Sequence, residues 1–507
     1  MDSNRERSHS ETNEAGRQRA SAACDACRAR KCVFPGGRAT CSTCSTCAEL
    51  CIACTHTLPR KKRGPRNRYV QALQLQLDDT SVHAPKAPMT LDLVAPRPVL
   101  DHMIRDWFDW IHPLAPLLHP DQFRARIAQQ YAGQPSEPSF VILVSSVCAA
   151  TVASLRRRRD LYGGVTVEGC LALAENLGLW SRAGTITLEW TTAMYNFSSA
   201  QYMEHGIDSA LSFRLAAEAV IGLRYQLYYE LPRMPFLDQQ LLKRLYWLVF
   251  AGQCTMSIYG RPMLHLHGAH EQVQALVPLE ISDGELLRGC PTSIRPANPA
   301  ASPSRSYIPG LNALSRLFQT WQSSQAVPQK TMAHLQEHID RAQHVLDNLP
   351  PELTWKGHPS SPECGREQGQ GDFGTDAQTV NLKVTQLHIR SNLLEQMNTL
   401  ARHQNLPVTP SAIVEERHRV VDDLLDILYH MPKEVFDANG YSVIPKIRDI
   451  GSALLDEDRT GNRSQGVSMQ ATAKLDRLLA KLENLDVRPP PQTPIDTPAT
   501  IESRYYQ

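Results

Sequence analysis

Cysteine is concentrated in one short stretch of the 507-residue sequence. Eight of the 13 cysteines lie between residues 24 and 54, and five of them fall within the fourteen residues CSTCSTCAELCIAC. Zinc is held by four cysteine or histidine ligands, which often come in C-x2-C pairs. Cys24 and Cys27 form such a pair, as do Cys44 and Cys47. No apolar secretory segment precedes the cluster, so metal binding is predicted rather than disulfide formation.

The second half of the cluster allows two alternative sets of ligands, because Ser-Thr-Cys occurs twice. One set uses Cys41, Cys44 and Cys51, and the other uses Cys44, Cys47 and Cys54. Both sets have C-x2-C-x6-C spacing, so the spacing by itself leaves the choice open.

The segments ACDACRARK, CSTCAELCIAC and PRKKRGP together resemble the fungal binuclear zinc cluster, in which six cysteines hold two zinc ions. The resemblance implies two Zn²⁺ ions here as well. In that family a basic linker closely follows the last cysteine, and five residues separate Cys54 from Arg60 here. This favours the second set, with Cys41 and Cys51 as alternates. The implied metal ligands are Cys24, Cys27, Cys32, Cys44, Cys47 and Cys54.

One spacing departs from the family pattern. The family has six residues between its second and third cysteines, whereas Cys27 and Cys32 are separated by four. On a helix, two residues correspond to a rotation of about 200°. Either the ligands are rearranged, with a spare cysteine in the third place, or the cluster is partly disabled.

The flanks of the cluster are strongly basic. Residues 24–70 contain ten basic and two acidic residues, while the whole chain has a net charge of only +1. Such a local excess is typical of nucleic-acid binding, and the run from Arg60 could also act as a nuclear localisation signal. By resemblance, Arg30 and Lys31 approach the bases of CGG-like half-sites in double-stranded DNA, and Arg28 contacts the backbone. The linker residues expected to contact phosphates are Arg60, Lys61, Lys62, Arg63, Arg66 and Arg68.

Dimerisation is left open by the sequence. Val70, Leu73 and Leu77 have helical spacing, but they cover only about two turns, and a coiled coil needs three to four heptads. The prolines from Pro85 onward then end any helix. A monomer and a weak homodimer both remain open.

The rest of the chain has a helical pattern with little strand-like alternation. Apolar residues recur at helical spacing over residues 214–229, 241–258, 332–346 and 420–431, and the third of these must end at Leu349-Pro350. The predicted fold class is mainly α: a small N-terminal binuclear zinc cluster module followed by a large irregular all-helical domain. The predicted divisions are a disordered start (1–23), the zinc module (24–58), a basic linker with a short helix (59–98), the helical domain (99–485) and a disordered tail (486–507).

Three stretches of the helical part resemble the fungal-specific transcription factor domain. They are WFDWIHPLAPLLHPDQF (107–123), LLKRLYWLVFAGQCTMSIYGRP (241–262) and LDNLPPELTW (346–355). That family commonly has Asp-Arg where Gln253-Cys254 stand here. The resemblance implies a regulatory domain of the kind often found with the zinc module.

Three other features of the sequence could indicate a different function. Phe140–Leu155 is apolar but shorter than the roughly 20 residues that span a bilayer, so a buried helix is predicted and no membrane association. His334 and His338 match the H-x-x-E-H pattern of zinc proteases, but no third ligand can be placed. His265, His267 and His270 are predicted to be ordinary surface or core residues.

The sequence therefore predicts a nuclear, non-enzymatic regulator that binds specific DNA sequences and controls RNA polymerase II genes through the transcription machinery. Control of a secondary-metabolite gene cluster is an expectation from chain length within the family. The alternative is a helical interaction protein with a degenerate zinc cluster, which modulates another regulator without reading DNA sequence.

Overall fold

The structure is a computed structural model, and the chain divides into two compact units, residues 1–86 and residues 87–507. Every regular element within the described residues is a helix, so the predicted mainly helical fold is confirmed. The structure describes residues 24–26, 45–55, 90–134, 137–181, 186–261, 266, 273–287, 306–355, 372–403, 410–459 and 465–485.

The N-terminal unit contains one short described helix, α2 (Ser45–Glu49), and a helical turn at Asp25 and Ala26. The chain after α2 returns to this turn, where the backbone N–H of Asp25 donates to the carbonyl of Thr55 at 2.8 Å. The predicted disordered start, the basic linker up to residue 89 and the tail from residue 486 lie outside the described residues.

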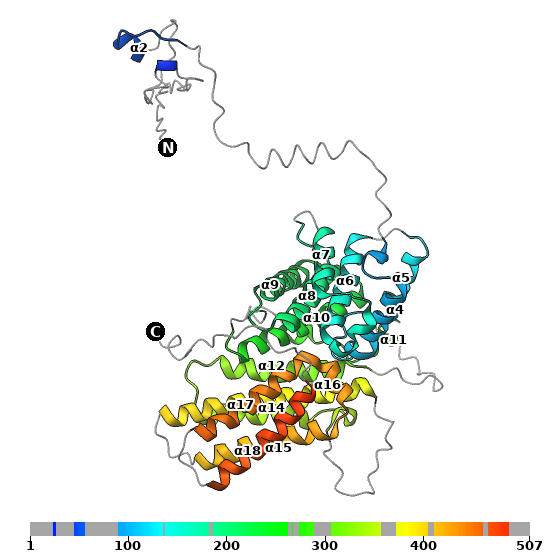
Figure 1. The fold of residues 1–507 in the computed structure, drawn as a ribbon, viewed down its shortest axis with the longest axis vertical. Helices are drawn as coiled ribbons and strands as arrows, with labels where there is room; N and C mark the ends of the chain where they lie inside the picture. The colour runs from blue at the N-terminus through cyan, green and yellow to red at the C-terminus, as the bar shows by residue number, and fades with distance from the viewer. Residues whose placement is uncertain are drawn as a thin grey trace, which may run out of the picture. The chain divides into compact units, whose positions relative to one another are not determined.

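The first half of the second unit is organised around α6, in which 15 of 17 residues are buried. Helix α6 packs against α7 and α8, and α8 packs against α9 (Figure 1). The apolar stretch 140–155 is thus a buried helix, as predicted, and no described helix is long and apolar enough to cross a membrane. The elements are η2 (Leu91–Leu93), α4 (Arg97–Asp106), the π-helical turn η3 (Trp107–Ile111), α5 (Pro120–Tyr131), α6 (Pro138–Ser154), η4 (Arg156–Tyr162), α7 (Val167–Asn176), α8 (Leu188–His205), α9 (Ala210–Tyr225), the π-helical turn η5 (Gln226–Glu230), η6 (Leu231–Arg233) and α10 (Phe236–Ile258).

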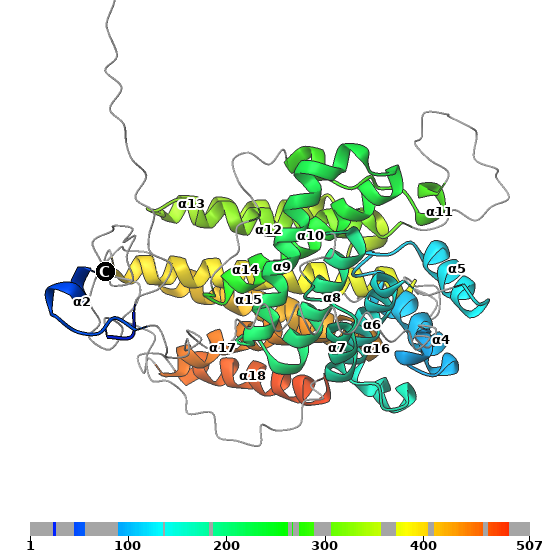
Figure 2. The ribbon, with the colours of Figure 1, turned by 90° about the horizontal axis from the view of Figure 1, so that it is seen from above.

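The second half is organised around the long helix α14, which contacts α12, α13, α15, α16 and α17. Figures 1 and 2 show α14, α15, α17 and α18 lying side by side with roughly parallel axes. A single apolar core runs through both halves, from Leu91 to Leu485. The elements are η7 (Val273–Leu276), α11 (Asp283–Leu286), α12 (Ile308–Gln325), α13 (Met332–Asp347), η8 (Pro351–Leu353), α14 (Phe373–His403), α15 (Pro410–His430), α16 (Lys433–Asn439), η9 (Gly440–Ser442), α17 (Ile444–Arg459) and α18 (Gln465–Leu485).

The helices predicted from apolar spacing are present. Helix α13 ends at Asp347, just before the Leu349-Pro350 stop. Helix α14 begins at Phe373, within the polar, glycine-containing stretch 356–377. The carboxylate of Asp372 explains this start: it accepts hydrogen bonds from the backbone N–H and the hydroxyl of Thr375, at 3.2 and 2.7 Å. The apolar core also includes part of the predicted linker (59–98), since Leu91 is buried in it.

Candidate functional site

Three of the predicted metal ligands lie together in the N-terminal unit. The Sγ atoms of Cys24, Cys47 and Cys54 all lie within 4.8 Å of one another, and those of Cys24 and Cys47 are 3.5 Å apart. This is the only group of three potential metal-ligating residues within the described part of the chain. Cys24 and Cys47 are fully buried, and Cys54 is half-buried.

Helix α2 determines which cysteines of the second half face this group. Cys47 lies on α2 and points inward, while Cys51 follows the helix and is exposed. Cys51 has a φ of 47°, in the left-handed region, at the point where the chain leaves the helix. The backbone N–H of Ile52 then donates to the carbonyl of Cys47, at 3.1 Å. This turn directs the chain back, so that Cys54 reaches the buried pair.

Residues of the described part of the N-terminal unit pack around the cysteine group. The only apolar residues packed against Cys24 and Cys47 in the described part of this unit are Ala26, Ile52 and Cys54. Asp25 closes the loop with two contacts to Thr55, one between backbones and one from the Thr55 hydroxyl to its carboxylate at 3.1 Å. Very small modules in general often need metal or disulfide links for stability.

The geometry of the group fits zinc. A Zn–S bond of about 2.3 Å in a tetrahedron places two sulfurs roughly 3.8 Å apart, close to the separation of Cys24 and Cys47. A disulfide would need about 2.05 Å. Thiolate sulfur is a preferred ligand of zinc and of other soft metals. Cys24, Cys47 and Cys54 are therefore a suitable part of a zinc site.

The remaining predicted site residues lie outside the described residues. They are the ligands Cys27, Cys32 and Cys44, the alternate Cys41, and the basic residues Arg28, Arg30, Lys31, Arg60, Lys61, Lys62, Arg63, Arg66 and Arg68. His265, His267 and His270 of the histidine-rich stretch are also outside.

The residues of the H-x-x-E-H match on α13 make ordinary contacts with the rest of the protein. The ring of His338 is buried and contacts the carbonyl of His334, at 2.8 Å. His334 contacts the carbonyl of Ser324 at 3.2 Å, and the exposed Glu337 pairs with Arg341 one turn later. Each of these side chains therefore has a protein partner of its own.

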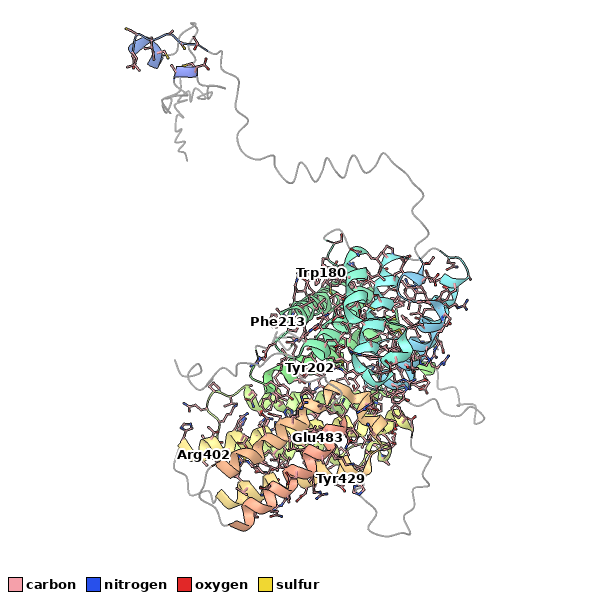
Figure 3. All side chains as sticks on the ribbon, in the orientation of Figure 1. Trp180, Tyr202, Phe213, Arg402, Tyr429 and Glu483 are labelled. Atoms are coloured by element: carbon pink, nitrogen blue, oxygen red, sulfur yellow. The ribbon has the colours of Figure 1, made fainter. Side chains whose placement is uncertain are left out.

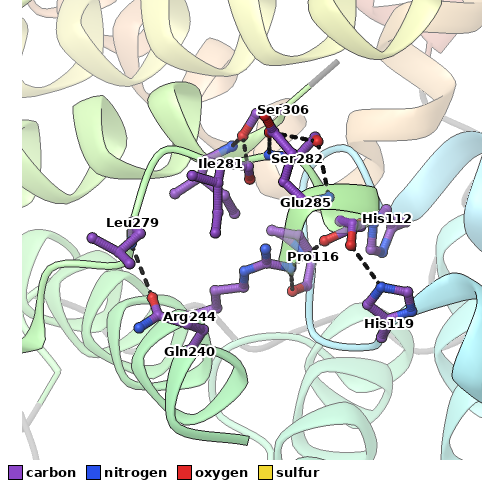
Figure 4. Close-up of polar contacts among 12 residues, drawn as sticks. His112, Pro116, His119, Gln240, Arg244, Leu279, Ile281, Ser282, Glu285 and Ser306 are labelled. Carbon is purple, nitrogen blue, oxygen red and sulfur yellow. Dashed lines mark hydrogen bonds and ion pairs between the residues drawn. The ribbon is translucent and has the colours of Figure 1, made fainter. Parts of the chain in front are cut away.

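A second polar cluster, which the sequence did not predict, lies inside the helical unit (Figure 4). Asp283 on α11 contacts the ring of His112, at 2.9 Å, and accepts from Nη1 of Arg244 at 2.7 Å. Burial alone would raise the pKa of Asp283, but the hydrogen bond to His112 and the charge of Arg244 lower it. Burial lowers the pKa of His112 from its ordinary value, and Asp283 offsets part of that effect.

This cluster joins two of the stretches that carry the family resemblance. His112 and His119 belong to residues 107–123, and Arg244 belongs to residues 241–262. His119 contacts the backbone carbonyl of Asp283 at 2.8 Å, and Arg244 also donates to the carbonyl of Pro116. In the third stretch, Nε1 of Trp355 donates to Asp426 on α15 at 2.8 Å. The cluster is therefore a structural link between these segments.

Comparison with known proteins identifies fungal regulators as relatives. The chain is similar to the maltose fermentation regulatory protein MAL33 of Saccharomyces cerevisiae, with 24% identity over 254 residues, which are 47% of this chain and 50% of that protein. It is similar to the respiratory transcription factor ZNF1 of the same yeast, with 26% identity over 40% of this chain and 43% of that protein. It is also similar to cutinase transcription factor 1 alpha of Fusarium vanettenii, with 23% identity over 45% of this chain and 25% of that protein.

The chain thus matches about half the length of the yeast relatives. No family model matches the chain, and no solved structure matches it. The resemblance to fungal binuclear zinc cluster transcription factors is confirmed by these relatives.

Proposed function

Because the chain is a relative of fungal transcription factors, we propose that it is a nuclear regulator that binds specific DNA sequences through an N-terminal binuclear zinc cluster. The observation that carries the proposal is the convergence of Cys24, Cys47 and Cys54 next to a strongly basic segment. The proposed output is transcription of RNA polymerase II genes through contacts with the transcription machinery. A secondary-metabolite gene cluster is one proposed target.

The zinc ions are proposed to be held by Cys24, Cys27, Cys32, Cys44, Cys47 and Cys54. When bound, zinc would cross-link the segments that carry these cysteines. The exposure of Cys51 and the burial of Cys47 favour the set that ends at Cys54. The chain's own contribution is the return of residues 51–55 to the Asp25 turn, which brings the first and last cysteines of that set together.

DNA recognition is proposed to divide between two groups of basic residues. Arg30 and Lys31 follow the first cysteine pair and would donate to the O6 and N7 acceptors of guanine in CGG half-sites. The run from Arg60 to Arg68 would neutralise phosphates, which gives affinity and strong salt dependence without sequence selectivity.

The test uses the full-length chain, with the zinc-to-protein ratio measured beside gel-shift titrations. One probe carries CGG half-sites, the other a scrambled sequence of the same composition. Two zinc ions per chain and tighter binding to the CGG probe are expected. Lys31→Met should weaken binding to the CGG probe alone. Lys62→Met should weaken binding to both probes and reduce the salt slope by about 0.9.

Equal affinity for the two probes would contradict sequence-specific recognition. Together with fewer than two zinc ions per chain, that result would favour the alternative, a helical interaction protein with a degenerate zinc cluster. The four-residue spacing between Cys27 and Cys32 is the feature that would then account for the loss of a metal ion.

A further inference from the structure

A cavity of about 240 Å³ lies where the two halves of the helical unit meet. Helices α8, α9 and α10 line one side, and α12, α14, α16 and α17 line the other. Most of the lining is apolar, including Trp107, Leu248 and Phe318. A concave, mainly apolar site with a few polar groups is the usual form of a small-molecule site in proteins.

The cavity reaches the surface at the side where α8, α9 and α10 meet. Phe213 lines the cavity and is 39% exposed, and the half-buried Tyr202 and Met256 lie on the same lining. Figure 3 shows Phe213 and Tyr202 on the same side of the helical unit. A small molecule could therefore enter between these side chains without unfolding the core.

The inner end of the cavity holds a buried lysine. Lys446 on α17 lines the cavity and is 4% exposed. Its Nζ donates to the hydroxyl of Thr385 at 2.7 Å and lies 5.6 Å from the centre of the Phe318 ring. No carboxylate oxygen among the described residues lies within 4.0 Å of this Nζ. A buried lysine without an acidic partner is rare, because burial of a lone charge is costly.

Asp449, three residues further along α17, is already engaged. His388 and Asn392 both contact Oδ2 of Asp449, at 2.6 and 3.0 Å. Burial lowers the pKa of Lys446 to about 7, so an anion beside it would favour the charged form. Asn439 adds a second polar group to the lining. Its side-chain amide donates to two carbonyls, but its buried Oδ1 has no hydrogen-bond partner.

We propose that this cavity binds a small apolar molecule that carries one anionic group, such as a carboxylate, and one hydrogen-bond donor. The anionic group would lie against Lys446, the donor would reach Asn439, and the apolar body would fill the space between α10 and α14. Charge-assisted hydrogen bonds in a water-poor site are the strong ones, so Lys446 would determine the preference for anions.

A glycine at the cavity wall supports this assignment. Gly252 lies inside α10, lines the cavity and is exposed, so a Cβ atom added to it would meet nothing within 4 Å. Glycine inside a helix is unfavourable relative to other residues. Its presence therefore keeps the exposed opening of the cavity at α10 free of a side chain.

The test uses two fluorescent probes that share an aromatic body and one N–H donor. The first, 1-anilinonaphthalene-8-sulfonate, is anionic, and the second, N-phenyl-1-naphthylamine, is neutral. The full-length chain should bind the sulfonate more tightly below pH 7. Lys446→Met should weaken sulfonate binding by about tenfold or more and leave binding of the neutral probe unchanged. Lys330→Met is the matched control. Lys330 is half-buried, lies outside the cavity lining, and donates hydrogen bonds to Gln325 and Gln396 among the described residues.

Gly252→Leu is the second test. Leucine favours the helix over glycine, so this variant should fold at least as well as the original chain, yet it should lose binding of both probes. Sulfonate binding that Lys446→Met leaves unchanged would overturn the proposal. Binding of both probes that survives Gly252→Leu would also overturn it, because the probes would then lie on exposed apolar surface elsewhere.

Discussion

The buried Arg244 and the half-buried Asp283 form an ion pair that joins two segments of the helical unit. Nη1 of Arg244 lies 2.7 Å from Oδ1 of Asp283, and the side chain of Arg244 is 1% exposed. Arg244 lies on α10. Asp283 is the first residue of α11 and follows the N-cap residue Ser282. The same carboxylate contacts His112 in the turn after η3. The pair therefore fixes the short α11 segment against both α10 and that turn.

Removing the carboxylate should destabilise the helical unit severely. Asp283→Ala leaves a buried guanidinium without its acid, and breaking a buried pair in this way costs about 3–5 kcal/mol. Urea denaturation followed by circular dichroism measures the effect. Asp208→Ala is the control, because Asp208 pairs with Arg261 at the surface and its side chain is 71% exposed. That change should cost less than about 1 kcal/mol. Equal losses for the two variants would contradict the structural role of Asp283.

Lys446 should make the stability of the helical unit depend on pH. Burial lowers its pKa to about 7 from an ordinary value of 10.5. Between these values the unfolded chain binds more protons than the folded chain, so the free energy of unfolding should rise as pH increases through this range. The neighbouring titratable groups are His388 and Asp449, which are paired with each other.

The rise should be smaller in Lys446→Met, because burial also lowers the pKa of Lys330 and Lys243 in the same direction. Urea midpoints of both proteins across this pH range measure the difference, and Lys433→Met is the control, because Lys433 is exposed. A parallel pH dependence of the original chain and Lys446→Met would show that another group is responsible.

Two helix glycines should respond oppositely to alanine. A Cβ at Gly252 meets nothing within 4 Å, so Gly252→Ala should raise the free energy of unfolding by about 1 kcal/mol. A Cβ at Gly222 would lie 2.5 Å from Oγ1 of Thr191 and 3.1 Å from the Trp190 ring. Thr191 cannot move freely, because its hydroxyl donates to Thr187 at 2.9 Å and accepts from Gln226 at 2.6 Å.

Gly222→Ala should therefore lower stability by about 1–3 kcal/mol. Thermal melting of the two variants beside the original chain is sufficient to compare them. The same direction of change at both positions would contradict the packing described for α8 and α9.

The two alternative cysteine sets predict different zinc losses. If the proposed set is used, Cys47→Ala should lose bound zinc, because Cys47 is buried beside Cys24. Cys51→Ala should keep the full zinc content, because Cys51 is exposed. Elemental analysis of purified full-length variants measures the ratio. Zinc loss in Cys51→Ala with retention in Cys47→Ala would favour the other set.

Composition and local spacing were sufficient to predict the helical fold and the types of residue in the candidate metal centre. Apolar periodicity indicates helices such as α13 and α15, and proline marks where α13 must end, because both signals act within a few residues. The cysteine pairs indicate a metal centre for the same reason. The sequence also held an unused signal at Lys446, which lies three residues after Val443 and four before Ile450 and so falls on the buried face of α17.

Other features depended on contacts between residues far apart in the chain. The two ligand sets, one with Cys47 and one with Cys51, have the same spacing in the sequence, and only the direction of α2 and the turn after it distinguish the buried thiol from the exposed one. Asp283 lies 39 residues from Arg244 and 171 from His112, so no local pattern could pair them. The cavity beside Lys446 exists only where the two halves of the unit meet. Sequence thus determined what each segment forms, and packing decided which side chains share a site, because burial and charge pairing are properties of the folded chain.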